Sequence, residues 1–244
     1  MVRAARWAIR TGPKPHSTHR NTPSAGTTKA MAICISMPQN LDRLTVAQWL
    51  SPAFPVGSYA YSQGLEQAIT DGHLTDPASL QDWITAILTQ GSARMDAILL
   101  AHARTTDGLS DLAFAYATSA ERCVEMREQG AAFTQVLATL GHSQPPLPYA
   151  IAIGQACRTL TLRAEEILAL YLHSLAAQLT SVAVRFIPLS AALGQRVLAD
   201  LAPLITRLAA HYATEPLDAL SSATIGADLA AMRHETLPVR IYRS

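Results

Sequence analysis

Lysine is nearly absent from this sequence of 244 residues, in which Lys14 and Lys29 are the only two. A phosphate-binding loop of the type GxxxxGKS or GxxxxGKT requires a lysine beside the nucleotide phosphates, so residues 41–244 cannot supply one. The motifs GxGxxG, HExxH and GxSxG are absent as well. We therefore do not expect the chain to hydrolyse nucleotides, and no sequence motif predicts another enzymatic activity.

Cysteine is scarce, with Cys34, Cys123 and Cys157 as the only three. They form no CxxC pair and their number is odd, so neither a disulfide framework nor a zinc knuckle is expected. The eight histidines are scattered along the chain, whereas a metal site usually leaves paired ligands at helical spacing. We expect no metal site, no cofactor and a reducing, cytoplasmic location.

Acidic residues are missing from the first 40 positions, which carry six basic residues. We expect residues 1–40 to be a disordered basic leader or the result of a mis-assigned start codon, with Met31 or Met37 as alternative starts. Residues 41–244 hold 13 arginines against 18 acidic residues, so their net charge is about −5 and nucleic-acid binding is not expected. We find no charge-free apolar run of the roughly 18 residues that suggest a membrane helix.

From Leu41 onward, apolar residues recur with the period of an α-helix. The clearest helix follows Asp76 and Pro77, a cap and a first-turn proline, and ends at Gly91. We predict a single all-α domain over residues 41–244, a bundle of eight to ten helices without strands. Further helices are expected over residues 92–105, 109–129, 130–140, 149–160, 165–186 and 190–212, with the proline-rich loop 142–148 between two halves.

The stretch FPVGSYAYSQGLE, residues 54–66, predicts a turn at Pro55 and Gly57 followed by a helix capped by Ser58. Tyr61, Leu65, Ala68 and Ile69 would line its apolar face, and Tyr59, Ser62, Glu66 and Thr70 the opposite, exposed face. Gly64 would let another backbone approach closely. An exposed tyrosine beside such a glycine favours a docking surface, although Tyr59 could also simply pack over the turn.

The C-terminal stretch MRHETLPVRIYRS, residues 232–244, is the second informative segment. Pro238 stops any helix, and Arg240 and Arg243 then flank Ile241 and Tyr242. This pattern predicts an extended tail that docks on a partner, and the alternative is a tail that docks on its own domain.

Charged residues inside two predicted helices have simpler interpretations. Glu121 and Glu125 lie beside Arg122 and Arg127 at helical spacing, as on a solvated helix face that carries ion pairs. Arg185 stands in an apolar stretch, where a guanidinium needs a carboxylate or carbonyl partner or must emerge at an interface.

Three separated blocks of the sequence together resemble one protein family. They are SPAFPVGSYAYSQGLEQAI (51–69), SVAVRFIPLSAALGQRVLADL (181–201) and MRHETLPVRIYRS (232–244). In this order and spacing they are similar to the blocks of the urease accessory protein F family (UreF), and the resemblance covers residues 41–244. The segment LSAALGQ after Pro188 departs from the family's shorter PLGQ-like turn.

The resemblance implies an all-α, non-enzymatic assembly chaperone for the nickel enzyme urease. Members of the family bind a second accessory protein, UreD (also called UreH), and as that complex recruit the nickel-carrying GTPase UreG to apo-urease. They tend to form homodimers, and their C-terminal tail becomes ordered when it meets UreD/UreH. By position, the resemblance implies partner-binding roles for Tyr59, Arg233, His234, Glu235, Arg240, Tyr242 and Arg243, to which the polar face adds Ser62 and Glu66.

Two other classes of function stay open at this point. An α-helical enzyme would need a buried pocket that joins Tyr59, Glu66 and Arg185, although no nucleophile and base pair is recognisable. A metal-storing or metal-delivering protein would bind nickel tightly as an isolated chain.

Overall fold

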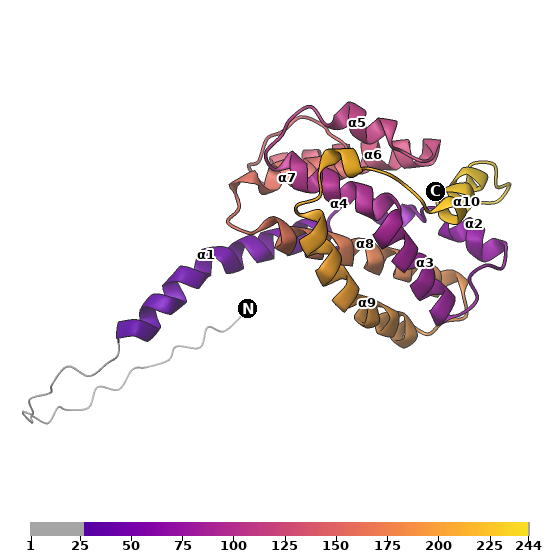
Figure 1. Cartoon of the computed structure of the whole chain (residues 1–244), viewed down its shortest axis with the longest axis horizontal. Coiled ribbons are helices and arrows are strands. Elements are labelled where there is room, and N and C mark those ends of the chain that lie inside the picture. Colours follow the sequence, from indigo (N-terminus) through magenta and orange to yellow (C-terminus); the bar gives the residue numbers. More distant parts are fainter. Residues whose placement is uncertain (1–26, 244) are drawn as a thin grey trace, which may run out of the picture. The chain divides into compact units, whose positions relative to one another are not determined.

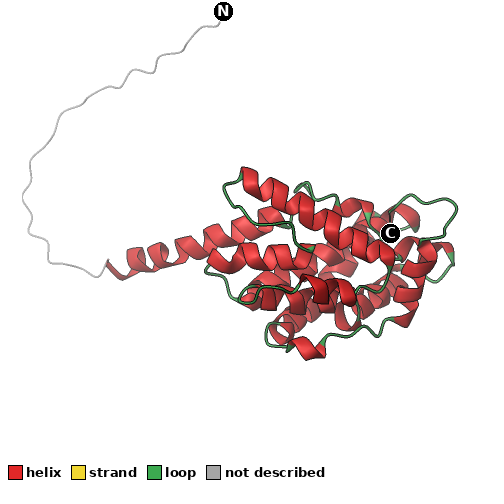
Figure 2. Cartoon of the chain, turned by 90° about the horizontal axis from the view of Figure 1, so that it is seen from above, coloured by secondary structure: helices red, strands yellow, loops and turns green. Residues whose placement is uncertain are grey.

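The structure, a computed structural model, describes the backbone of residues 27–243 and the side chains of residues 38–243. Over this range the chain forms ten α-helices, three short 3-10 helices and no strand, which confirms the predicted all-α bundle (Figures 1 and 2). The chain divides into two units, residues 1–37 and 38–244. Helix α1 (Thr27–Trp49) runs across the expected leader boundary at residue 41, and residues 1–26 of the predicted leader lie outside the described residues.

Most of the remaining helices lie in segments that the sequence predicts as helical. Their bounds are η1 Ser58–Ala60, α2 Leu65–Thr70, α3 Pro77–Gln90, α4 Ser92–Ala103, α5 Ser110–Ala115, α6 Ala120–Thr139, α7 Tyr149–Ala156, η2 Cys157–Thr159, α8 Ala164–Phe186, α9 Ala191–Tyr212, η3 Leu217–Ala219 and α10 Ile225–His234.

Helix α8 is the central element of the bundle, as its apolar circumference predicts. It packs against α9, α4, α2 and α3, and Leu172, Ala176 and Leu179 are fully buried. By length and composition alone α8 could cross a membrane, so the expectation that the sequence holds no such apolar run is wrong. However, 56% of its apolar window is buried inside the protein, as for a core helix.

Local sequence signals account for the start of α3. The side chain of Asp76 accepts a hydrogen bond from the backbone N–H of Ser79 at 2.8 Å, and Ser79 bonds back to the backbone N–H of Asp76. Pro77 occupies the first helical position, where its missing N–H costs nothing. The predicted helix from Pro77 to the glycine at position 91 is therefore confirmed.

The predicted break between residues 129 and 130 is wrong, because α6 continues through Gly130. A Cβ atom at this position would lie 1.8 Å from the carbonyl oxygen of Leu147. Gly130 therefore serves the close approach of the proline-rich loop to α6 rather than a helix end. The break falls earlier, where residues 116–119 separate α5 from α6 and the side chain of Ser119 caps α6.

The segment that departs from the family pattern forms the beginning of α9. The side chain of Ser190 accepts a hydrogen bond from the backbone N–H of Leu193 at 3.2 Å, which is an ordinary helix N-cap. Pro188 ends the preceding segment, as predicted, and α9 then continues through Pro203.

Candidate docking surface and cavity

The turn after Pro55 differs from the predicted helix. Gly57 and Gly64 both have left-handed backbones, with φ of 73° and 78°. They enclose the short helix η1 and an extended Tyr61, so α2 begins only at Leu65 and Ser58 does not cap it. The prediction of a continuous helix from Ser58 is therefore wrong, because apolar spacing cannot reveal two positive φ angles.

Gly64 brings two helices into close backbone contact, as the sequence predicts. A Cβ atom on Gly64 would lie 2.6 Å from the backbone nitrogen of Ala231 and 3.1 Å from the carbonyl oxygen of Ala227. The approaching backbone belongs to α10 of the same chain. Figure 1 shows α2, α10 and the C-terminus at the same end of the bundle.

Glu66 holds the C-terminal tail, defined here as residues 235–243, on its own domain. Its carboxylate accepts hydrogen bonds from the backbone N–H groups of Ile241 and Tyr242, each at 2.9 Å. Burial alone would raise the pKa of Glu66, but the hydrogen bonds from His234, Ile241 and Tyr242 outweigh it and lower this pKa. Glu66 and Ser62 are buried, so the prediction that both lie on an exposed helix face is wrong.

His234 is fully buried between two carboxylates at the end of α10. Its Nε2 lies 3.0 Å from Glu66 Oε2, and its Nδ1 lies 2.9 Å from Glu121 Oε2. An ionised carboxylate only accepts hydrogen bonds, so both contacts are satisfied together when each ring nitrogen carries a proton. His234 therefore joins α10 to α2 and α6.

The charged residues of the tail also have partners within the chain. Arg240 pairs with Glu121 at 2.8 Å, and Arg243 pairs with Glu128 at 2.5 Å. The side chain of Glu235 accepts a hydrogen bond from the backbone N–H of Ala120, at the first turn of α6.

The aromatic residue of the tail is buried too. The ring of Tyr242 lies 5.4 Å from that of Phe186, between centroids. At the end of α10, Arg233 makes a longer contact of 3.8 Å with Asp71. The structure therefore shows the alternative that the sequence left open, a tail docked on its own domain.

Much of the surface around the tail stays exposed and apolar. Tyr59 is 68% exposed, Val239 80% and Ile241 74%. On α10, Ile225, Leu229 and Met232 are also exposed. Scattered apolar residues are normal on a surface, but several at one end of the molecule are typical of an interaction site. We call Tyr59, Val239, Ile241 and these three residues of α10 the docking surface.

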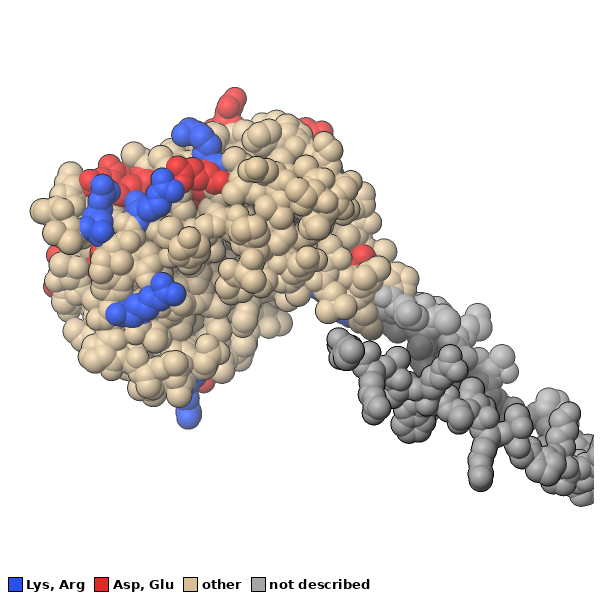
Figure 3. Space-filling model, turned by 180° about the vertical axis from the view of Figure 1, so that it is seen from behind, with Lys and Arg blue, Asp and Glu red and all other residues tan. Residues whose placement is uncertain are grey.

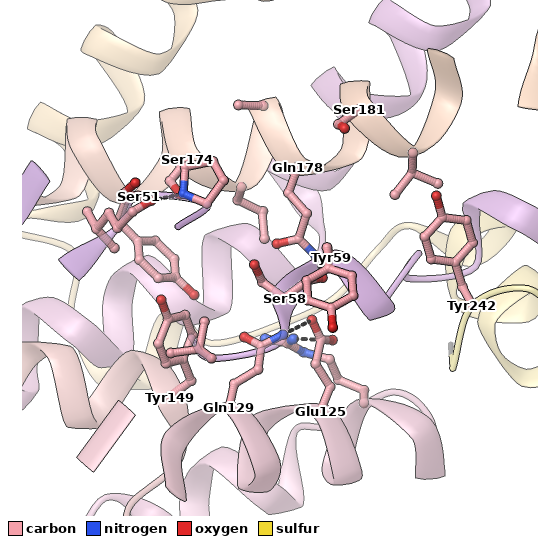
Figure 4. A pocket seen from close by; sticks show the side chains of 18 of the residues that line it. Ser51, Ser58, Tyr59, Glu125, Gln129, Tyr149, Ser174, Gln178, Ser181 and Tyr242 are labelled. Atoms are coloured by element: carbon pink, nitrogen blue, oxygen red, sulfur yellow. Dashed lines mark hydrogen bonds and ion pairs between the residues drawn. The ribbon is translucent and has the colours of Figure 1, made fainter. Parts of the chain in front are cut away.

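A cavity of about 320 Å³ lies between α6 and α8, next to the docking surface. Figure 4 shows Ser174, Gln178 and Ser181 entering from α8, and Glu125 and Gln129 from α6. Tyr59, Tyr242 and Arg185 also line the cavity. Gln178 donates hydrogen bonds to the carbonyl oxygens of Ser58 and Tyr61, at 2.6 and 3.1 Å, which holds the η1 turn against α8.

A buried ionic network forms the floor of this cavity. Arg122 pairs with both Asp96 and Glu125, and these three side chains are almost completely buried. Burial would lower the pKa of Arg122, but the two carboxylates outweigh it and raise this pKa. The expectation of a solvated helix face is therefore wrong for Arg122 and Glu125, because helical spacing does not reveal what α6 packs against.

Amide and phenol groups complete the network. Gln63 and Gln129 donate to the carboxylate of Glu125 at 3.1 and 2.9 Å. Tyr171 donates its hydroxyl hydrogen to Asp96 at 2.7 Å, and burial is the main cause of its raised pKa. Gln63 has a left-handed φ of 51°, a strained value for a residue with a side chain. The network thus joins α4, α6, α8 and the segment before α2.

The cavity does not join the three residues of the enzyme alternative. Tyr59 and Arg185 line it, but Glu66 does not, because its carboxylate faces His234 and the tail. Within residues 38–243, no three side chains of His, Cys, Asp or Glu are placed to hold a metal ion. Figure 3 shows one face of the molecule on which most of the surface carries no charge and one group of acidic residues lies beside basic ones.

Comparisons with known proteins agree with the sequence blocks. The UreF family model matches residues 74–202. A protein of Cereibacter sphaeroides named "Urease accessory protein UreF" is 54% identical over 205 residues, 82% of this chain and 98% of its own length. Proteins of the same name from Paracoccus denitrificans and Dinoroseobacter shibae are 48% and 46% identical, over 83% of this chain and 96% and 98% of their own lengths. With a matching family model and relatives of this identity and coverage, the chain belongs to the UreF family.

Proposed function

We propose that this chain is an assembly chaperone in urease maturation, which binds the accessory protein UreD/UreH and recruits the GTPase UreG to apo-urease. As a member of the UreF family the chain is an accessory protein and not an enzyme. The observation that carries the proposal is the family membership together with the exposed apolar docking surface around the tail.

The docking surface has the composition of a protein interface. It offers an exposed tyrosine and several aliphatic side chains, with Arg240 and Arg243 at its edge. The tail is held by the Glu66 carboxylate and by ion pairs with Glu121 and Glu128, so a partner meets a segment that is already ordered and loses less entropy on binding. In this proposal the buried residues of the predicted site position the tail and do not touch the partner. They are Glu66, His234 and Tyr242, together with Ser62, whose hydroxyl accepts a hydrogen bond from the backbone N–H of Glu66 at 3.4 Å.

The mechanism we propose is thermodynamic linkage between the proteins of one complex. The chain would favour one conformation of UreG and urease, which couples the nucleotide state to nickel insertion. The same proposal includes a cytoplasmic location and a homodimeric state. Light scattering of the purified protein tests whether it is a dimer.

Co-purification with UreD/UreH tests the docking surface. We expect Ile241→Asp to abolish it, because the side chain is 74% exposed and its replacement leaves the backbone contact to Glu66 in place. Tyr59→Ala should weaken binding by about 2 kcal/mol if the ring is a hot spot.

Two exposed residues outside the docking surface serve as matched controls. Leu140→Asp, just past the C-terminal end of α6, and Tyr116→Ala, at the end of α5, should leave co-purification unchanged. Absence of co-purification for the unmodified chain, or equal binding of Ile241→Asp, would contradict the proposal.

A further inference from the structure

We infer that the cavity between α6 and α8 is the receptor for one apolar side chain of a partner protein, on an acidic segment whose carboxylate pairs with Arg185. The inference rests on the proposed function, because it assumes that the chain assembles with other proteins.

Arg185 is the exposed charge of the cavity. Three charged side chains line it, and the other two, Arg122 and Glu125, belong to the buried network, which with Asp96 holds two carboxylates and one guanidinium. Arg185 is exposed, and among the residues that the structure describes it makes no hydrogen bond or ion pair. A guanidinium binds a carboxylate in a bidentate geometry, so this residue favours an acidic partner.

The size and the walls of the cavity suit a side chain. Its volume of about 320 Å³ is larger than any single side chain needs, and Leu50, Val56, Leu175 and Val182 contribute apolar surface to the walls. An aromatic or large aliphatic side chain that fills such a pocket is a typical anchor of a protein interface.

The surroundings of the cavity favour a protein over a small molecule. Tyr59 belongs both to the cavity wall and to the exposed docking surface. Tyr242 forms another part of the wall, and its neighbour Ile241 points its side chain to solvent. An anchor in the cavity would therefore lie next to a wider apolar contact, which a free metabolite could not use.

Short peptides test the inference on the full chain alone, without any partner protein. We would titrate the protein with the peptides acetyl-Gly-Asp-Phe-Asp-Gly-amide and acetyl-Gly-Lys-Phe-Lys-Gly-amide and follow the NMR signals of Gln178 and Ser181. The acidic peptide should bind with a Kd of about 1 mM and the basic peptide at least about tenfold more weakly.

Two variants test the charge of Arg185 and the volume of the cavity separately. Arg185→Glu should reverse the preference between the two peptides, and Ala177→Trp should abolish binding of both by filling the cavity. The exposed arginine of α9 provides the matched control, and Arg196→Glu should change neither affinity. Circular dichroism of each variant checks that the helices are intact.

The possible outcomes decide the inference independently of the proposed function. Equal binding of both peptides, no binding at several millimolar, or unchanged binding to Arg185→Glu overturns it. Binding of 4-phenylbutyrate as tightly as the acidic peptide also overturns it, since the site would then be one for small carboxylic acids. A separate co-purification with UreD/UreH distinguishes the inference from the proposed function. If Ile241→Asp loses the complex and Arg185→Glu keeps it, the proposed function is supported and the inference is contradicted.

Discussion

Glu66 contacts both α10 and the tail with one buried carboxylate. Its two carboxylate oxygens accept hydrogen bonds from two backbone N–H groups and from His234, at 2.9 to 3.0 Å. Hydrogen bonds to a charged, buried acceptor contribute more than neutral ones, about 1.5–3 kcal/mol each. Nothing in the sequence marks this role, because the partners of Glu66 lie some 170 positions away along the chain.

Replacing this carboxylate should release the tail. We expect Glu66→Gln to lower the free energy of unfolding by about 2–4 kcal/mol, since His234 would lose a charged partner inside the protein. Hydrogen exchange of residues 235–243 should become much faster. Glu165→Gln, in the first turn of α8, is the control. Loss of its exposed ion pair with Arg163 should lower the free energy of unfolding by less than about 1 kcal/mol and leave the exchange of the tail unchanged. Unchanged exchange in Glu66→Gln would show that Glu66 does not hold the tail.

Acid should release the tail as well. The pKa of Glu66 is lowered below its ordinary value of 4.5, so its contribution to stability is complete above that value and is lost as the pH falls through the folded pKa. NMR signals of the Ile241 and Tyr242 amides should therefore stay constant near neutral pH and shift at a pH below 4.5. Glu121 and Glu128 also face the tail. In the Glu66→Gln variant, the part of the amide shift that Glu66 causes should disappear. An unchanged shift in this variant would show that Glu66 does not cause it.

At the scale of elements, Gly130 and Gly64 show how a glycine lets a neighbouring segment approach a helix. Gly130 admits the carbonyl of Leu147 against α6, and Gly64 admits the backbone of α10 against α2. Sequence periodicity predicts the existence of most helices, and capping residues predict the starts of some. It cannot tell a glycine that ends a helix from a glycine that accommodates a neighbour, since both look the same in one sequence.

Two glycines with nearly the same backbone conformation allow the cost of backbone strain to be distinguished from the cost of a steric clash. Gly64 and Gly72 have φ of 78° and 76°, but only at Gly64 would a Cβ atom meet other atoms. Gly72→Ala should therefore cost about 1 kcal/mol, the price of a left-handed alanine. Gly64→Ala should cost more, by about 1–3 kcal/mol, because α10 must move. Urea unfolding measures both, and equal losses would mean that α10 does not rest on Gly64.

At the scale of the whole molecule, a buried ionic network joins helices that are distant in sequence. Asp96 comes from α4, Arg122 and Glu125 from α6, and Tyr171 from α8. The all-α class and the position of α8 follow from hydrophobic spacing. The network and the cavity above it do not, because they depend on which charged face of α6 turns inward.

Removing the cation of this network should destabilise the entire bundle. We expect Arg122→Leu to lower the free energy of unfolding by about 3–5 kcal/mol, because two carboxylates would stay buried without a counter-charge. Thermal unfolding followed by circular dichroism measures the loss. Arg196→Leu on the surface of α9 should have almost no effect, and a similar melting temperature for both variants would rule out a central role of the network.

The close backbone packing of α10 on Gly64 predicts how α10 and the tail respond to ionic strength. Contact between two backbones is insensitive to dissolved ions, whereas the half-exposed pairs of Arg240 and Arg243 with their glutamates are screened as salt is added. Concentrated sodium chloride should thus loosen the two arginines while α10 stays in place. A partner that needs those guanidinium groups would compete with contacts that are already weak under physiological conditions.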